Sequence, residues 1–231
     1  LHSTSRRQRQ MCIRDSWVYV STLPFAFYDN RGAVVLNNEI HIMGTNSGES
    51  ATQHYKWNGS SWVSVSTLPY SMYQGSAVVL NDEIHILGGL SNDKKHYKWD
   101  GSSWTSVSTL PYSFGHGSAV VLNSEIHILG GDFSSATKHY KWNGSAWTSV
   151  STLPDGFSGG DAIIMNNEIH IFRLDDDIKA HYKWDGSSWI SVDTLPYEFA
   201  FGSAQLVENE IFLVGGSNNP TAHYAYKEVT E

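Results

Sequence analysis

The sequence predicts an all-β fold built from one four-stranded unit repeated around a ring, and three observations predict it. The segment HYKWDGSSWTSVSTLP at 96–111 recurs with few changes at 54–69, 139–154 and 181–196. The spacing is nearly constant, with steps of 42, 43, 42 and 42 residues between the equivalent histidines, which are His54, His96, His139, His181 and His223. Each period holds four short β-branched or aromatic runs between turn signals, which indicates four strands. Four-stranded sheets repeated in this way pack around an axis as a β-propeller.

The first strand of each unit is predicted to be the innermost one. Residues 77–80 read AVVL and residues 162–165 read AIIM, so apolar side chains occupy consecutive positions instead of alternating. A strand of this kind has both faces covered. The second strand reads Ile-His-Ile, and the repeated segment supplies the third and fourth strands.

The hairpin between the third and fourth strands contains Asn-Gly or Asp-Gly at 58–59, 100–101, 143–144 and 185–186. These pairs favour a two-residue type I′ turn, which fixes the register of a hairpin. With Trp99 and Ser102 flanking such a turn, Tyr97 is predicted to lie opposite Trp104. An aromatic cross-strand pair of this kind contributes roughly 0.2 to 1 kcal/mol.

A double glycine after the second strand gives a more specific signal. It occurs at 88–89, 130–131 and 215–216, and it is followed by a tyrosine and, seven residues later, a tryptophan, as in Tyr97 and Trp104. This pattern resembles the kelch motif and covers residues 17–226, although 44–45 read Gly-Thr and 173–174 read Arg-Leu. The resemblance implies that each unit is a kelch-type propeller blade. A WD40 propeller is the alternative, but Trp-Asp at 99–100 and 184–185 opens a turn here, and the Gly-His partner motif is missing.

The order of strands predicts five blades. The chain starts with a fourth strand at Trp17 and stops after a third strand near residue 226. Residues 17–22 are therefore predicted to complete the last blade and close the ring, leaving no exposed sheet edge. Residues 6–16, RRQRQMCIRDS, share nothing with the repeats and resemble translated sequencing-adapter read-through from assembled environmental reads. We interpret 1–16 as a non-native or disordered tail and 17–231 as the propeller, and a six-bladed parent stays open as an alternative.

Composition excludes several classes of partner. The formal charge is −8, and without 1–16 the propeller holds 11 basic and 22 acidic residues. This balance argues against nucleic acid or an anionic membrane as partner. The one cysteine, Cys12, lies in the tail, so disulfides and thiolate metal sites are not expected in the propeller.

Repeated histidines are interpreted as structural. His41, His85, His127 and His170 recur in the second strand, and the third-strand set is named above. Equivalent histidines in different blades lie too far apart to share an ion, and two neutral imidazoles within one blade fall short of the ligands that zinc takes. We expect hydrogen-bonded histidines and no metal or cofactor. Residues 175–177, Asp-Asp-Asp, are interpreted as a solvated loop in preference to a calcium loop.

Catalysis is not expected. A copper oxidase of the galactose oxidase kind needs a cysteine cross-linked to tyrosine, and a sialidase needs three arginines, whereas the propeller has only Arg31 and Arg173. His116 is its one histidine outside the repeat positions, and no base and orienter pair is visible around it. A hydrolase or oxidoreductase on this scaffold is kept as the weakest alternative.

Variation between blades predicts the functional face. The turns after the first and third strands are nearly constant, whereas the connections after the second and fourth strands differ and emerge on the opposite face. Variable loops on a rigid scaffold are where binding residues are usually found. The recurring aromatic three residues past each Leu-Pro is interpreted as packing. The candidate ligand-binding residues are those that do not recur: Tyr28, Arg31, Tyr73, Gln74, His116, Phe133, Arg173 and Phe201.

Together these observations predict a non-catalytic recognition module that binds a protein or a glycan over its variable-loop face. Its similar blades resemble repeat propellers of bacterial surface or phage tail proteins, at the level of the fold alone. That resemblance implies a cell-surface, secreted or virion-associated location, and a monomer or a module of a larger assembly. A structural spacer in such an assembly is the alternative.

Overall fold

The computed structural model describes residues 19–27, 31–44, 52–89, 94–172, 179–196, 199, 202–215 and 223–228. Within them the chain forms five antiparallel sheets and the short 3₁₀ helix η2 (Phe133–Ser135). Blade one is β1 (Ala33–Leu36), β2 (Glu39–Met43), β3 (His54–Trp57) and β4 (Trp62–Ser64). Blade two is β5 (Ser76–Leu80), β6 (Glu83–Leu87), β7 (Lys95–Trp99) and β8 (Trp104–Thr109). Blade three is β9 (Ser118–Leu122), β10 (Glu125–Leu129), β11 (His139–Trp142) and β12 (Trp147–Ser149). Blade four is β13 (Asp161–Met165), β14 (Glu168–Phe172), β15 (Ala180–Trp184) and β16 (Trp189–Thr194), and blade five is β17 (Ser203–Val207), β18 (Glu210–Val214) and β19 (His223–Tyr226).

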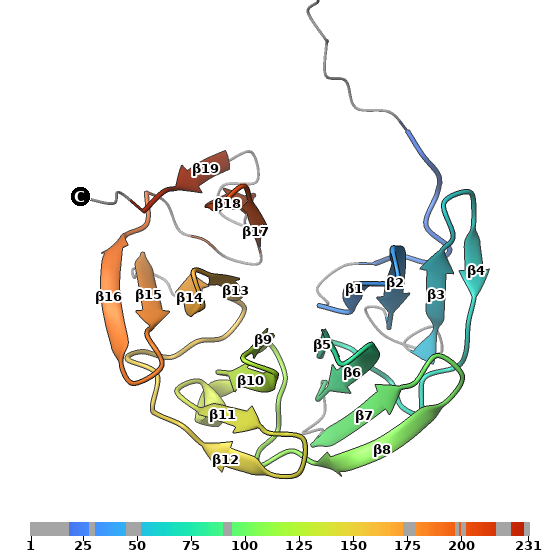
Figure 1. The fold of residues 1–231 in the computed structure, drawn as a ribbon, viewed down its shortest axis with the longest axis horizontal. Helices are drawn as coiled ribbons and strands as arrows, with labels where there is room; N and C mark the ends of the chain where they lie inside the picture. The colour runs from blue at the N-terminus through green and yellow to red at the C-terminus, as the bar shows by residue number, and fades with distance from the viewer. Residues whose placement is uncertain are drawn as a thin grey trace, which may run out of the picture.

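The five sheets are arranged around a common centre in chain order, as in a propeller (Figure 1). The first strand of each blade is innermost, and successive inner strands β1, β5, β9, β13 and β17 contact one another around the centre. The predicted fold class, an all-β propeller of five blades, is confirmed. No helix in the described part of the chain is long and apolar enough to span a membrane.

The turn between the first and second strands carries the left-handed backbone. Asn81 and Asp82 have φ of 52° and 60°, and Leu80 pairs with Glu83 directly across the turn. Two successive positive φ angles define a type I′ hairpin, whose twist matches the flanking strands. The same two positions have positive φ in every blade. The type I′ turn is therefore in the hairpin between the first and second strands, and not in the Asn-Gly or Asp-Gly hairpin for which it was predicted.

The register of the hairpin between the third and fourth strands differs from the prediction. Trp99 pairs with Trp104, and Tyr97 pairs with Ser106, so the predicted pairing of Tyr97 with Trp104 is wrong. The cause is the Asp100 side chain, whose Oδ1 accepts hydrogen bonds of 2.8 Å from the backbone N–H groups of Ser102 and of the residue after it. An aspartate that binds the backbone in this way stabilises a loop of four residues instead of two. The paired aromatics are consequently two tryptophans, with ring centres 5.5 Å apart.

Packing between blades forms the core. Leu80 and Leu87 of blade two pack with Ile126, Ile128 and Trp142 of blade three, and equivalent clusters join the other neighbours. The residue three past each Leu-Pro is fully buried in four blades, which confirms its predicted packing role; these residues are Met72, Phe114, Phe157 and Phe199. Burying a side chain of this size stabilises the fold by about 1.5–3 kcal/mol.

The double glycine lies where the loop of the following blade crosses. Gly88 has a φ of +63°, and a Cβ atom on it would lie 1.9 Å from the carbonyl oxygen of Phe114. Gly89 donates its N–H to the same oxygen at 2.8 Å. Gly130 and Phe157 repeat this close approach between blades three and four. Glycine is required here because any side chain would displace the neighbouring loop.

The repeated histidines form a buried pair inside each of the first four blades. In blade two, His85 Nδ1 and His96 Nε2 are 2.8 Å apart, and His96 packs edge-on against Trp142 and Trp147 of blade three. The other pairs are His41–His54, His127–His139 and His170–His181. Burial lowers the pKa of His85 to about 4 and that of His96 to about 3, so both are neutral at pH 7. Their predicted hydrogen-bonding role is confirmed.

The closure of the ring differs from the prediction. In the described residues blade five has three strands, and residues 19–22 do not pair with β19. They lie instead beside blade one, where Trp62 Nε1 donates to Ser21 Oγ at 3.0 Å (Figure 1). The ring has a gap between blades one and five (Figure 1), and the contact with Trp62 places residues 19–22 on the blade-one side of it, away from β19. The other residues of the predicted closing strand, 17 and 18, and the tail 1–16 lie outside the described residues.

Candidate functional site: the mouth of the central channel

The loops that lead into the inner strands bring one repeat position to the centre of the ring. In the described part of the chain this position is held by Gln74, His116 and Gly159, each three residues before the alanine of its inner strand. Arg31 lies beside it in the loop before blade one, two residues before Ala33. Gln74, His116 and Gly159 have φ of 58°, 56° and 69°, so the backbone conformation is the same whatever the side chain. The side chain changes from blade to blade, while the backbone geometry repeats.

Neighbouring loops hold one another through the backbone. The N–H of His116 donates to the carbonyl of Gln74 at 3.0 Å, and the N–H of Gly159 donates to the carbonyl of His116 at 2.8 Å. Arg31 joins the same ring, since its N–H donates to the carbonyl of Gly75 at 3.3 Å. The rim is therefore rigid, which limits the entropy lost when a ligand binds. His116 is partly exposed on it, whereas the Gln74 side chain is buried.

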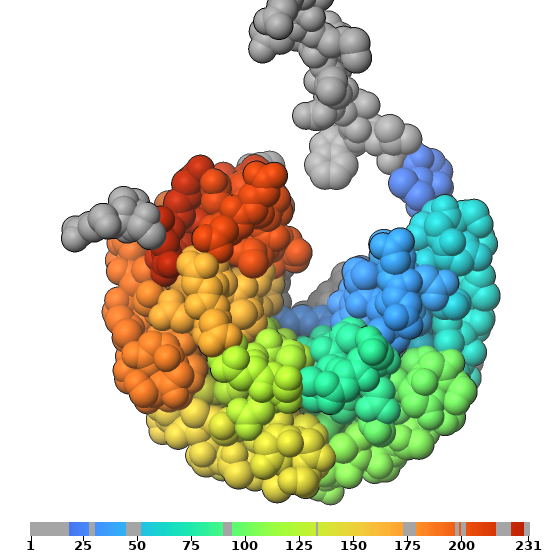
Figure 2. Space-filling view, in the orientation of Figure 1, coloured from blue at the N-terminus to red at the C-terminus, as the bar shows by residue number. Residues whose placement is uncertain are grey.

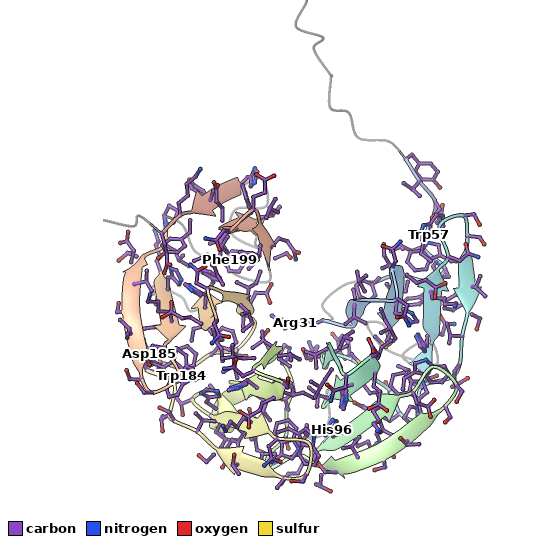
Figure 3. The ribbon with its side chains drawn as sticks, viewed as in Figure 1. Arg31, Trp57, His96, Trp184, Asp185 and Phe199 are labelled. Carbon is purple, nitrogen blue, oxygen red and sulfur yellow. The ribbon has the colours of Figure 1, made fainter. Side chains whose placement is uncertain are left out.

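A pocket of about 1010 Å³ lies in the central channel, and Arg31 lines it, whereas Gln74, His116 and Gly159 do not. Its wall is formed largely by the first residues of the inner strands, and Figure 3 shows Arg31 at the inner edge of the ring. The size is at the upper end of the range for small-ligand pockets. The polar side chains in its wall are Arg31, Ser76, Ser118, Asp161, Ser203 and Gln205.

Arg31 and Asp161 bring opposite charges together across the channel. Arg31 Nε lies 3.8 Å from Asp161 Oδ1, and the guanidinium also donates to the carbonyl of Gly160. The Asp161 carboxylate accepts the N–H groups of Ala162 and Ala204, both at 2.9 Å. Burial raises the pKa of Asp161, and Arg31 and these hydrogen bonds oppose that rise. Asp161 thus joins blade four to blade five while facing the pocket.

His116 forms a second contact with a carboxylate on this face. Its Nδ1 lies 2.7 Å from Asp132 Oδ1, and both side chains are partly exposed. His116 comes from the loop before blade three, whereas Asp132 follows β10 of that blade. The contact confirms that the two sets of variable loops share one face of the propeller. It also gives His116 a carboxylate partner that sequence reasoning missed.

The eight predicted ligand-binding residues have different outcomes. The structure brings Arg31, Gln74 and His116 together at the rim, and places the half-buried Tyr73 directly before Gln74. Phe133 opens η2, next to Asp132, but its side chain is outside the described set. The remaining three also lie outside the described residues: Tyr28, Arg173 and Phe201.

Sequence reasoning missed Asp161. Aligning the repeats shows serine at the equivalent position in three blades, at Ser76, Ser118 and Ser203. Ser76 Oγ accepts the N–H of Ala119 at 3.2 Å, as Asp161 accepts that of Ala204, so this position links successive blades. The signal in the sequence was a single charged residue, Asp161, at a repeat position that is serine in three other blades.

One group of three metal-ligating side chains exists in the described residues, between blades four and five. Donor atoms of Glu168, His170 and Glu228 lie within 4.8 Å of one another. Lys183 Nζ binds both carboxylates, at 2.9 Å from Glu168 and 3.1 Å from Glu228. The same glutamate–lysine pair recurs in blades one to three, as Glu83 with Lys98 at 2.8 Å. We interpret the group as this repeated ion pair extended by one carboxylate.

Comparison with known proteins supports the propeller fold. No family model matches the chain, and no curated protein matches it. Among solved structures, the chain is similar to the structure of YjhT, with a TM-score of 0.72 and 14% identity. The match covers 85% of this chain and 75% of that one. At this identity the likeness shows the propeller fold alone, and such a fold serves in general as a binding or scaffold module.

Proposed function

We propose that this chain is a non-catalytic recognition module of kelch-type blades, which binds a protein or a glycan at the mouth of its central channel. The proposal includes the location and setting expected from the sequence: a cell-surface, secreted or virion-associated protein, monomeric or part of a larger assembly, with no nucleic acid or membrane as partner. Neither a cofactor nor a metal is part of it.

One observation carries the proposal. Gln74, His116 and Gly159 occupy one repeated position with one backbone arrangement, and Arg31 lies beside them and lines the central pocket. At the histidine pairs of blades one to four, by contrast, the equivalent positions keep their residue. A surface that varies only in its side chains, on a rim fixed by backbone hydrogen bonds, has the properties of a binding face.

The chemistry of the rim fits a polar ligand. Arg31 and His116 offer N–H donors, and Asp161 and Asp132 offer carboxylate acceptors within the same face. Arginine is prominent among the residues that dominate binding energy at protein interfaces. Sugar hydroxyls and peptide groups both pair with such a mixed set of donors and acceptors.

The first test is a glycan array and a whole-cell binding screen with the full chain, beside a variant of the rim. The variant is Arg31→Ala with Gln74→Gly and His116→Gly, because Gly159 shows that glycine fits this backbone position. We expect a bound glycan or cell surface whose signal falls at least about tenfold in the variant, the equivalent of about 1.4 kcal/mol.

A matched control changes the opposite face. Ser61→Ala, Ser103→Ala and Ser188→Ala copy Ala146 of blade three and alter only the turns between third and fourth strands. Binding should survive these changes. A signal that the rim variant keeps, while it folds as the parent does, contradicts the assignment of the site. The absence of any signal from the parent chain favours the structural spacer.

A further inference from the structure

The two ends of the ring carry the surfaces with which blades pack on each other. In blades two to four, the face toward the preceding blade contains an isoleucine of the second strand, and these residues, Ile84, Ile126 and Ile169, are all 0% exposed. The equivalent residue of blade one, Ile40, is 44% exposed, and its cross-strand neighbour Val35 is 63% exposed. Blade one therefore presents an interblade surface that nothing in the described structure covers.

Blade five presents the matching surface. Leu80 and Leu87 of blade two, 7% and 0% exposed, pack on blade three. Their equivalents in blade five, Val207 and Val214, are 52% and 47% exposed. Figure 2 shows that a gap in the ring separates the two uncovered surfaces.

Residues 21–25 indicate what belongs in the gap. The bond from Trp62 to Ser21, 3.0 Å, repeats the bond of 2.9 Å from Trp147 to Ser108 at the end of β8, the fourth strand of the preceding blade. The contact of Phe25 with Tyr55 repeats that of Tyr112 with Tyr140, with ring centres 5.9 and 5.6 Å apart. Residues 21–25 thus occupy the place where the fourth strand of a preceding blade would end.

The blade to which this segment would belong is not beside it. Leu23 is 42% exposed, whereas its equivalents are at most 6% exposed; they are Leu68, Leu110, Leu153 and Leu195. Phe27 is half-buried, whereas its equivalent Phe114 is fully buried. In the described residues, neither side chain is covered by the first three strands of the blade to which it would belong.

We propose that the gap is the docking site for one further blade of the same repeat, carried on the same polypeptide, so that the complete ring has six blades. In the described residues β19 has no fourth strand beside it, and residues 21–25 have no first, second or third strand. In chain order, the missing pieces are a fourth strand followed by a first, a second and a third. They make one continuous repeat period, which is why a single polypeptide is the occupant. The added blade also brings a sixth loop to the rim of the channel.

The test extends the chain by one repeat. Residues 1–226 are followed by a copy of residues 143–184, which contains a turn and then the fourth, first, second and third strands. We expect the midpoint of thermal unfolding to rise by more than about 5 °C, since a newly buried interface worth a few kcal/mol has an effect of this size in a domain of this length. Binding of a hydrophobic dye to the folded chain should fall.

Substitutions in the two walls decide whether the gain arises in the gap. Val35→Asp and Val207→Asp change exposed side chains, so each should leave the original chain nearly unaffected and remove the gain from the extended chain. Val63→Asp is the matched control, because Val63 is 40% exposed but pairs with Lys56, on the other face of the sheet from Tyr55 and Trp57. The control should keep the gain.

Three results overturn the proposal. An unchanged midpoint in the extended chain shows that a repeat does not dock there. A disulfide that forms readily between Tyr19→Cys and Tyr224→Cys in the original chain, with Cys12→Ser, shows that blade five closes directly on blade one, since the register of β7 with β8 places these two residues opposite each other. A dimer that sedimentation detects and that Val35→Asp dissociates shows that a second copy fills the gap.

Discussion

The histidine pairs and the channel rim are both repeated around the ring, but the two regions keep different things constant. At the pairs, the side chains are identical in blades one to four, and each pair packs on the tryptophans or tyrosine of the following blade. At the rim, the backbone is constant and the side chain is glutamine, histidine or glycine. At the histidine pairs, side-chain packing holds neighbouring blades together. At the rim, backbone hydrogen bonds hold neighbouring loops together, so the side chains there can change while the blades stay in place.

Acid should remove the contribution of the histidine pairs and unfold the chain. Burial lowers the pKa of His54, His96, His139 and His181 to about 3 and that of His85 and His127 to about 4. The unfolded chain takes up protons below about pH 6.5 that the folded chain does not, so the free energy of unfolding is greatest above that pH and falls as pH drops toward 4. Each such proton costs about 1.4 kcal/mol per pH unit. Urea unfolding between pH 7 and pH 5 measures the slope, above the range where carboxylates titrate.

A matched variant tests whether the slope belongs to the pairs. Blade five has Phe212 where the other blades have the second-strand histidine, and its ring centre lies 5.5 Å from that of His223. His127→Phe copies this arrangement, so it should fold at neutral pH and reduce the slope by about one proton. A slope that is unchanged in this variant means that other groups cause the acid sensitivity.

Removing a glycine at the interblade crossing should have the next largest effect. Gly130 has a φ of +65°, and a Cβ atom on it would lie 1.9 Å from the carbonyl oxygen of Phe157. Gly130→Ala should therefore lower the free energy of unfolding by about 3 kcal/mol or more, since strain and a backbone clash act together. Gly101→Ala, at a φ of +98° with nothing within 4 Å, isolates the strain and should cost about 1 kcal/mol. Equal losses in the two variants would mean that the crossing loop yields easily.

These regions also differ in how much the sequence could predict. The repeat period was enough for the blades, the histidine pairs and the buried Phe114, because each follows from a pattern that recurs. The hairpin register was not, because Asp-Gly is compatible with a two-residue turn and with the four-residue loop that the Asp100 side chain stabilises. The pairing of Arg31 with Asp161 joins two residues far apart in the chain at a position that reads as serine in most blades. The place of residues 19–22 depends on their contact with Trp62 of blade one, which no local pattern encodes.

Substitutions of Asp161 can separate its structural hydrogen bond to blade five from the charge that it places in the pocket. Asp161→Ala removes the acceptor of the Ala204 N–H and should cost about 1–3 kcal/mol of stability. Asp161→Ser restores the residue of blades two, three and five and should cost less, because Ser76 Oγ already accepts the equivalent N–H. Both variants remove the charge that faces Arg31 in the pocket. Denaturant unfolding of the two variants, beside ligand binding, tells the structural hydrogen bond from the charge.

The smallest expected effect comes from a framework position that repeats as faithfully as the histidines but lies near solvent. Lys141 binds Glu125 at 2.8 Å, with both side chains partly exposed, so Lys141→Met should cost less than about 1 kcal/mol. Lys183 binds Glu168 and also Glu228, and these hydrogen bonds raise its pKa. Lys183→Met should therefore cost more than Lys141→Met, because it leaves two carboxylates close together, and the difference should shrink in 1 M salt. If the two variants lose the same stability at low and high salt, Glu228 adds nothing to blade four, and repetition at this position reflects the shared ancestry of the blades more than the energy of the pair.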